Sequence, residues 1–175
     1  MDTFDCIATK LEVKEYDTTK KVPFEVKLKV LEACRLTASG MNKQHWRFIM
    51  VQDRQHLQQL ATDSTTGKWV AKCDFAVIVL TDPSLAFHSI DAGRVLQDMQ
   101  LAAWNYGVGS RVFTGINVGI FRPDFAIPPQ LEPTVVAGFG YPAKKITGRR
   151  KERKSLEEIV SLEKYGNKFD PNSLR

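Results

Sequence analysis

The stretch "SIDAGRVLQDMQLAAWNYG", residues 89–107, carries the strongest periodic pattern in this chain. Its apolar side chains recur every three or four residues, which places them on one face of a helix. They are Ala92, Val95, Leu96, Met99, Ala102, Ala103 and Tyr106. Ser89 or Asp91 is able to cap the first turn, and Gly107 is able to end the helix. We therefore predict a long helix buried along one side, and we interpret the stripe as core rather than as a cofactor site.

Apolar runs on either side of this helix predict the strands of a sheet. "RFIMVQD" (residues 47–53) and "DFAVIVLTD" (residues 74–82) are short, apolar and closed by polar residues, as buried strands are. "VGSRVFTGIN" (residues 108–117) indicates a turn with glycines that leads into a strand. "TVVAGFGYP" (residues 134–142) indicates a core strand whose glycines allow close approach of the backbone.

Further helices are expected before and after these strands. Residues 23–37 show helical spacing, with Pro23 in the first turn, where its missing N–H is not needed. Residues 54–61 are expected to form a helix between the first two strands. Ser155 and Glu158 have the spacing of a capping box, which predicts a short helix near the C-terminus.

The composition predicts one soluble globular domain. The chain has 175 residues, of which 43% are hydrophobic and 26% charged, and no repeat or linker divides it. We expect a single domain over residues 1–175, with a polar C-terminal arm at about 164–175 that packs on a partner. No apolar run approaches the roughly 20 residues of a membrane helix, and the N-terminus lacks the regions of a secretory signal. A cytoplasmic protein with no membrane association is therefore expected.

Several kinds of protein-borne chemistry lack their sequence signals. The cysteines at 6, 34 and 73 are too few and too scattered for a disulfide framework or a metal clip, so we interpret them as buried apolar residues. The three histidines have no zinc-binding spacing, so no metal site is expected. No GxSxG, P-loop or HExxH motif occurs. If the protein is an enzyme, a bound cofactor is expected to supply the reactive atom.

The positive charge of the chain is concentrated in one run. Residues 144–154, "KKITGRRKERK", hold seven basic residues and one acidic residue, against a net charge of +5 for the whole chain. Such a run is a solvated loop, a nucleic-acid contact or the site of one small phosphorylated ligand. Nucleic acid is the weaker alternative, because no helix-turn-helix, zinc or ribonucleoprotein aromatic pattern accompanies the run.

The loop "ASGMNKQHW", residues 38–46, crowds polar side chains between a helix and a strand. Carboxamides offer both a donor and an acceptor, which suits the edge of a heterocycle such as an isoalloxazine. Ser and Asn also satisfy loop backbone at helix ends. Spacing alone leaves both interpretations open for Ser39, Asn42 and Gln44.

These segments together resemble the FMN-dependent nitroreductase family over nearly the whole chain. The loop matches the family pattern PSxxNxQPW at Ser39, Asn42, Gln44 and Trp46. "KLEVKEY" (residues 10–16) stands where the family has Arg-x-Ser-x-Arg/Lys, and residues 138–160 resemble its closing Gly-Tyr-Pro strand, basic phosphate contacts and leucine-rich end. The resemblance implies an α+β fold: a three-layer sandwich with a mixed, mostly antiparallel sheet flanked by helices, in an intertwined homodimer.

The resemblance also implies a set of cofactor-binding residues. Lys10, Lys151 and Arg153 are expected at the FMN phosphate, which prefers several cationic donors. Lys14 is expected near the N1 and C2 carbonyl edge of the ring, where a cation stabilises the reduced anionic flavin.

On the other side of the cofactor, Ser39, Asn42 and Gln44 are expected to hold ribityl and ring polar atoms, some of them from the second subunit. The backbone amides of Thr114 and Gly115 are expected near the ring and N5, where a side chain at 115 would crowd it. No catalytic side chain is assigned, because hydride transfer needs ring stacking and exclusion of water more than a protein acid or base.

The chain departs from the family pattern at four positions. Glu12 replaces the family serine, so we expect that it either turns away or weakens the phosphate pocket. Lys10 replaces an arginine and gives a point charge in place of a fork. Ala38 and His45 replace prolines, and we expect His45 to be a packed or surface residue, with proton donation to substrate as the alternative.

The function implied by the resemblance is an NAD(P)H-driven, two-electron reduction by a ping-pong route. The acceptors expected are small electron-poor molecules such as nitroaromatics or quinones, with residues 64–69 and 120–129 lining the substrate side. The homodimer is expected because so short a chain has little spare surface to enclose a large cofactor alone. The alternatives are different flavin chemistry on the same scaffold, a flavin-binding protein without turnover, and a basic nucleic-acid-binding protein.

Overall fold

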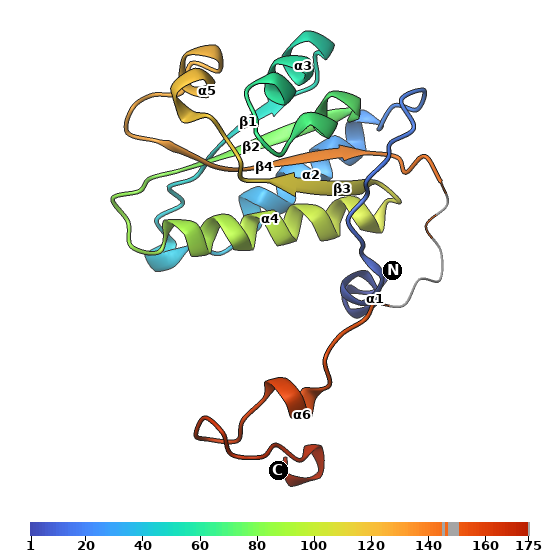
Figure 1. Ribbon diagram of the computed structural model, residues 1–175, viewed down its shortest axis with the longest axis vertical. Helices are drawn as coiled ribbons and strands as arrows, with labels where there is room; N and C mark the ends of the chain where they lie inside the picture. The colour runs from blue at the N-terminus through green and yellow to red at the C-terminus, as the bar shows by residue number, and fades with distance from the viewer. Residues whose placement is uncertain (145, 147–150, 175) are drawn as a thin grey trace.

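The computed structural model describes residues 1–144, 146 and 151–174, and its centre is a four-stranded antiparallel sheet (Figure 1). The strands lie side by side in the order β1-β2-β4-β3, so β3 forms one edge. Their bounds are Arg47–Val51 (β1), Phe75–Thr81 (β2), Gly109–Phe113 (β3) and Glu132–Gly140 (β4). The four strands predicted from apolar runs are confirmed.

Helices cover both faces of this sheet, which gives three layers. On one face pack α2 and α4, and on the other α3, η2 and α5. The helix bounds are Thr3–Thr9 (α1), Phe24–Leu36 (α2), Arg54–Thr62 (α3), His88–Asn105 (α4), Val118–Asp124 (α5) and Leu156–Ile159 (α6), with 3-10 helices at Gly40–Asn42 (η1), Lys68–Lys72 (η2) and Pro171–Ser173 (η3). The predicted α+β sandwich is confirmed. The short α1 and α5 were not predicted, because seven residues are too few for a clear periodicity.

The central strand β2 explains why two helical layers are needed. All of its residues are buried, and successive side chains of a strand point to opposite faces. Ala76, Ile78 and Leu80 join the core beneath α3 and α5. Phe75, Val77 and Val79 join the core beneath α2 and α4. A strand that is apolar on both sides must be covered on both sides.

The long helix α4 differs from its prediction at the N-terminal end. Phe87 is the N-cap and makes no side-chain capping bond, so the predicted cap at Ser89 or Asp91 is wrong. Asp91 lies in the first turn, where its buried carboxylate binds distant backbone and side-chain groups instead. Gly107 has φ +72° just after the helix and ends it as predicted, whereas Tyr106 is exposed and falls outside the buried stripe.

The N-terminal segment after α1 runs beside the edge strand β3. Glu12 forms a parallel bridge with Ser110, and the Val13 N–H donates to the Ser110 carbonyl oxygen at 2.9 Å. Tyr16 forms an antiparallel bridge with Pro142, at the end of β4. The N-terminus is thereby held against the start of β3.

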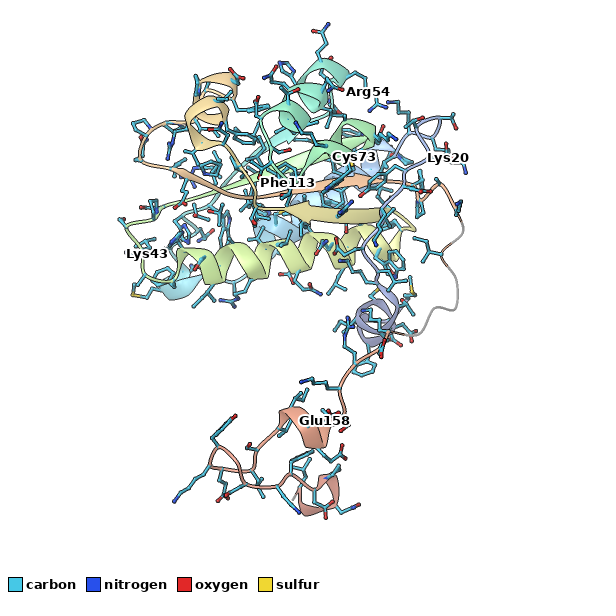
Figure 2. All side chains as sticks on the ribbon, viewed as in Figure 1. Lys20, Lys43, Arg54, Cys73, Phe113 and Glu158 are labelled. Carbon is cyan, nitrogen blue, oxygen red and sulfur yellow. The ribbon has the colours of Figure 1, made fainter. Side chains whose placement is uncertain are left out.

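The C-terminal segment lies apart from the sheet (Figures 1 and 2). The helix α6 begins with the predicted capping box of Ser155 and Glu158, and Figure 2 shows Glu158 well away from the strands. The extended part of the chain therefore includes residues ahead of 164. Across the described ranges, no helix has both the length and the apolar character needed to cross a membrane. All three cysteines are free and buried, as predicted.

Candidate cofactor-binding site

The three predicted phosphate-binding residues come together where α1 meets the segment that begins at residue 151. Lys10 is the C-cap of α1, and the Lys151 Nζ donates to the Ile7 carbonyl oxygen of the same helix at 2.5 Å. Partial burial lowers the pKa of Lys151, and the neighbouring charges of Arg153 and Lys10 lower it further. We call Lys10, Lys151 and Arg153 the cation cluster. Cations that repel one another in this way suit a phosphate, so the donor set fits FMN. Part of the basic run, at 145 and 147–150, lies outside the described residues.

Glu12 turns into this cluster rather than away from it. Its carboxylate forms an ion pair with the Lys10 ammonium. The Gln100 Nε2 donates to Glu12 Oε1 at 3.2 Å and to the Ser110 Oγ at 3.0 Å. Gln100 and Ser110 are both buried, so Glu12 is held from α4 as well as by Lys10. Of the two sequence-based interpretations, this pairing favours a weakened phosphate pocket over a Glu12 that turns away.

The backbone of Thr114 and Gly115, which was predicted to lie near the flavin ring, follows the other end of β3 directly. Thr114 is exposed, and the carbonyl oxygen of Gly115 accepts from the Thr65 N–H at 2.8 Å. A Cβ at Gly115 would lie 2.3 Å from the Thr65 Oγ1 and 2.5 Å from the Thr66 Oγ1. A side chain at 115 would therefore have to displace the hydroxyls of Thr65 and Thr66, independently of any ligand. The predicted substrate-side segment 64–69 lies beside this backbone. Lys14 is exposed on the segment that runs beside the start of β3.

The amide loop, residues 39–44, has a constrained backbone and exposed amide side chains. Met41, Asn42 and Gln44 have φ of +50°, +53° and +46°, a conformation that non-glycine residues adopt at a cost of about 1–2 kcal/mol each. The Ser39 Oγ accepts from the Gln44 N–H at 2.9 Å, and the Gln44 Nε2 donates to the Asn42 Oδ1 at 3.2 Å. Local bonding is thus present, as one interpretation expected. Strain of this kind accumulates at binding sites, and the amides of Asn42 and Gln44 remain exposed to a ligand.

A buried hydrogen bond between His45 and Asp91 holds the amide loop on α4. The His45 side chain is only 5% exposed, and its Nε2 lies 3.2 Å from the Asp91 Oδ2. The same Asp91 oxygen accepts from the Gly40 N–H at 2.9 Å. The Asp82 N–H donates to the His45 Nδ1 at 3.3 Å, so the ring carries its proton on Nε2 and donates it to Asp91. His45 is packed, as predicted, and positions the loop.

The helix α4 separates the amide loop from the cation cluster. Asp91 binds the loop near the start of the helix, whereas Trp104 Nε1 near its end donates to the Thr9 Oγ1 of α1 at 3.0 Å. A rise of about 1.5 Å per residue puts these two positions roughly 20 Å apart. Figure 2 shows Lys43 of the loop at one end of α4, and Figure 1 shows α1 near the other. Within one chain, Ser39, Asn42 and Gln44 therefore do not meet Lys10, Lys151 and Arg153.

Sequence reasoning missed the residues that support these groups. Gln100 was overlooked, although a polar residue among the apolar positions of a buried helix indicates a specific partner. Asp91 was interpreted as a cap because it stands near a helix start. No local pattern pairs it with His45, which is 46 positions away.

Known proteins share both the sequence pattern and the fold. The family model described as "Nitroreductase family" matches residues 9–80. A protein of Methanothermobacter thermautotrophicus, provisionally named NADH dehydrogenase/NAD(P)H nitroreductase, is 31% identical over 153 residues, which cover 82% of this chain and 79% of that protein. A crystal structure from Bacteroides thetaiotaomicron with the same provisional name is 26% identical and has a TM-score of 0.84, covering 93% of this chain and 98% of that one. An FMN-dependent nitroreductase from Clostridium difficile R20291 shares the fold at a TM-score of 0.83 and 18% identity, over 93% and 99% of the two chains.

Proposed function

Because the chain belongs to the nitroreductase family, a family of oxidoreductases, we propose that it binds FMN and uses NAD(P)H for two-electron reduction of small electron-poor acceptors. Nitroaromatics and quinones are the proposed acceptors, and a ping-pong route is the proposed order. The names of the relatives support the co-substrate, and the C. difficile R20291 neighbour supports FMN. The observation that carries the proposal is the convergence of Lys10, Lys151 and Arg153 from the two ends of the chain.

The cation cluster would hold the FMN phosphate. A phosphate monoester carries about −1.5 to −2 charge near pH 7, which these cations match. The guanidinium of Arg153 offers paired donors, and the ammonium groups of Lys10 and Lys151 offer point charges. The strand β3 runs from this cluster towards Thr114 and Gly115, so a mononucleotide laid along the edge of the sheet would reach both.

Bound FMN would supply the two-electron chemistry. The residues of the chain bind and orient the cofactor and exclude water, and no catalytic side chain is needed. Lys14 would place positive charge near N1, and the backbone of Thr114 and Gly115 would face the ring. The tight packing of Gly115 against Thr65 and Thr66 keeps that backbone in place.

We propose a homodimer in which each amide loop completes the site of the other chain. The roughly 20 Å between the loop and the cluster supports this, because two α4 helices packed antiparallel would bring the loop of one chain to the cluster of the other. Some of the exposed large apolar side chains lie on α2, α4 and the C-terminal segment: Phe24, Leu28, Leu36, Ile90, Leu156, Ile159, Tyr165 and Leu174. Surface of this kind is normally covered by a partner. We take residues 1–175 as one flavin-binding domain with a partner-binding arm, in the cytoplasm.

A second candidate function, flavin binding with little turnover, has one observation in its favour. The ion pair between Glu12 and Lys10 would weaken cofactor retention, because it occupies a cation that the phosphate needs. Nucleic-acid binding is weakened as a candidate by Lys151, which bonds the backbone of α1 rather than pointing outwards.

The absorption spectrum of the purified protein tests the proposal. We expect a yellow protein that releases FMN on denaturation, is bleached by NADH or NADPH, and is re-oxidised by a nitroaromatic or a quinone. A colourless protein that refuses added FMN would refute the proposal. A flavin that is bleached but not re-oxidised by these acceptors would favour different flavin chemistry on the same scaffold.

Two variants test the residue assignments. Arg153→Ala and Asn42→Ala should each weaken FMN binding by about tenfold or more, as expected for the loss of a charge-assisted or buried hydrogen bond. The neighbouring changes Lys154→Ala and Lys43→Ala remove exposed cations beside these positions and serve as controls. Equal FMN affinity in a variant and its control would show the assignment to be wrong.

A further inference from the structure

Glu12 is an acidic residue placed among cations that would bind phosphate. Its carboxylate pairs with Lys10, a member of the cation cluster. The Lys10 side chain is 11% exposed, whereas that of Glu12 is 45% exposed. The ammonium therefore lies beneath the surface, and the carboxylate lies on the side from which a ligand would approach.

The position of Glu12 is fixed by groups on two other elements. Gln100 on α4 donates one amide hydrogen to Glu12 and another to Ser110 on β3. The backbone on either side is held as well, because Glu12 bridges to Ser110 and Val13 donates to the same residue. A carboxylate held in this way cannot swing aside without leaving a buried amide and an ammonium unpaired.

On the basis of the proposed function, we propose that Glu12 is an internal anion that competes with the flavin phosphate for Lys10. The site therefore discriminates weakly between FMN and riboflavin, which lacks the phosphate. Glu12 is a specificity-determining residue for the flavin class.

The charges in the cluster support this assignment. Three cations and one carboxylate leave a net charge of +2, which the phosphate of FMN nearly cancels. When FMN binds, Lys10 must be shared between two anions, and the anions repel each other. Riboflavin meets no such repulsion, because it brings no charge. The interaction is screened less than at an open surface, since Lys10 is largely buried.

The test compares the two flavins on the flavin-free full-length protein. Dissociation constants for FMN and riboflavin are measured by quenching of flavin fluorescence in the unmodified chain and in Glu12→Gln and Glu12→Ser. Glutamine keeps the shape and can still accept from Gln100, and serine is the residue of the family pattern. Glu15→Gln is the matched control: it removes the same charge three positions away, at a carboxylate that is 71% exposed and 3.8 Å from Lys144.

We expect Glu12→Gln and Glu12→Ser each to tighten FMN binding about tenfold and to leave riboflavin binding within about twofold. Tenfold corresponds to about 1.4 kcal/mol. Riboflavin binding by the same variant shows that its site is folded. If the ratio of the FMN to the riboflavin dissociation constant in the Glu12 variants equalled that in Glu15→Gln, this inference would be overturned while the proposed function would stand. Equal changes for both flavins would also overturn it, since they would place Glu12 at the ribityl chain. If the unmodified chain bound neither flavin, the proposed function would fail, and this inference with it.

Discussion

Replacement of Asp91 by alanine should loosen the amide loop and lower the stability of the whole chain. The Asp91 carboxylate is 1% exposed and accepts from the Gly40 N–H and the His45 Nε2–H. Alanine leaves both donors without their acceptor in a site that water enters poorly. An unsatisfied buried donor costs about 1–3 kcal/mol. Gly40 is only half-buried, so we expect about 2–4 kcal/mol in total.

The same helix provides a control. Asp98 accepts from the Thr37 Oγ1 at 2.7 Å, but Thr37 also lies 2.9 Å from the Ala33 carbonyl oxygen and can donate there instead. Asp98→Ala should therefore cost less than about 1 kcal/mol. Both variants remove one negative charge from α4, so the comparison controls for the change in charge.

The assay is urea unfolding followed by circular dichroism, at one protein concentration because the stability of the proposed dimer would depend on concentration. The expected loss for Asp91→Ala corresponds to a fall in Tm of roughly 5–15 °C for a chain of this length. Tryptic cleavage after the exposed Lys43 reports the loop directly and should become faster. A stability within about 1 kcal/mol of Asp98→Ala, with unchanged cleavage at Lys43, would refute the anchoring role of the His45–Asp91 pair.

Three further predictions concern packing, pH and assembly. Gly115→Ala should destabilise the chain by about 1–3 kcal/mol in urea unfolding, because its Cβ would overlap two threonine side chains. Gly119→Ala in α5 meets nothing closer than 3.6 Å and should be neutral or slightly stabilising, because alanine favours a helix. Equal destabilisation by both changes would contradict this reasoning. Burial and the nearby Asp124 raise the pKa of Asp63 above 3.8, so the folded state holds this proton more tightly and stability falls as pH rises above about 3.8. Asp63→Asn should thus be more stable than the parent near pH 7, and this advantage should be lost at about pH 3.5. An advantage independent of pH would show that the raised pKa of Asp63 is not its cause. Ile159→Glu should shift the protein from the proposed dimer towards a monomer in light scattering, whereas Glu157→Gln on the same helix should not. If both variants kept the mass of a dimer, α6 would not be part of the dimer interface.

The partners of the residues that support the candidate site could not be predicted from sequence. The cationic residues were identified by resemblance to the family, and their convergence depends on folding the two ends of the chain together. Whether Glu12 faced the cluster was undecidable from its position alone, because the answer depends on Gln100, 88 positions away. The capping role predicted for Asp91 was wrong for the same reason. A carboxylate near a helix start can cap the helix locally, but that of Asp91 binds His45 and Gly40, which are distant in sequence.

The sequence by itself determined the four strands and the longer helices, together with their order. The stripe of α4, the fully apolar β2 and the glycine-ended turns are local patterns, and burial on one or two faces follows from the geometry of a helix or a strand. Only the tertiary structure decided that Glu12 pairs with Lys10, that His45 anchors the amide loop, and that this loop lies about 20 Å from the cation cluster. Charge pairing acts between groups within a few ångströms, and folding alone determines which distant segments come so close.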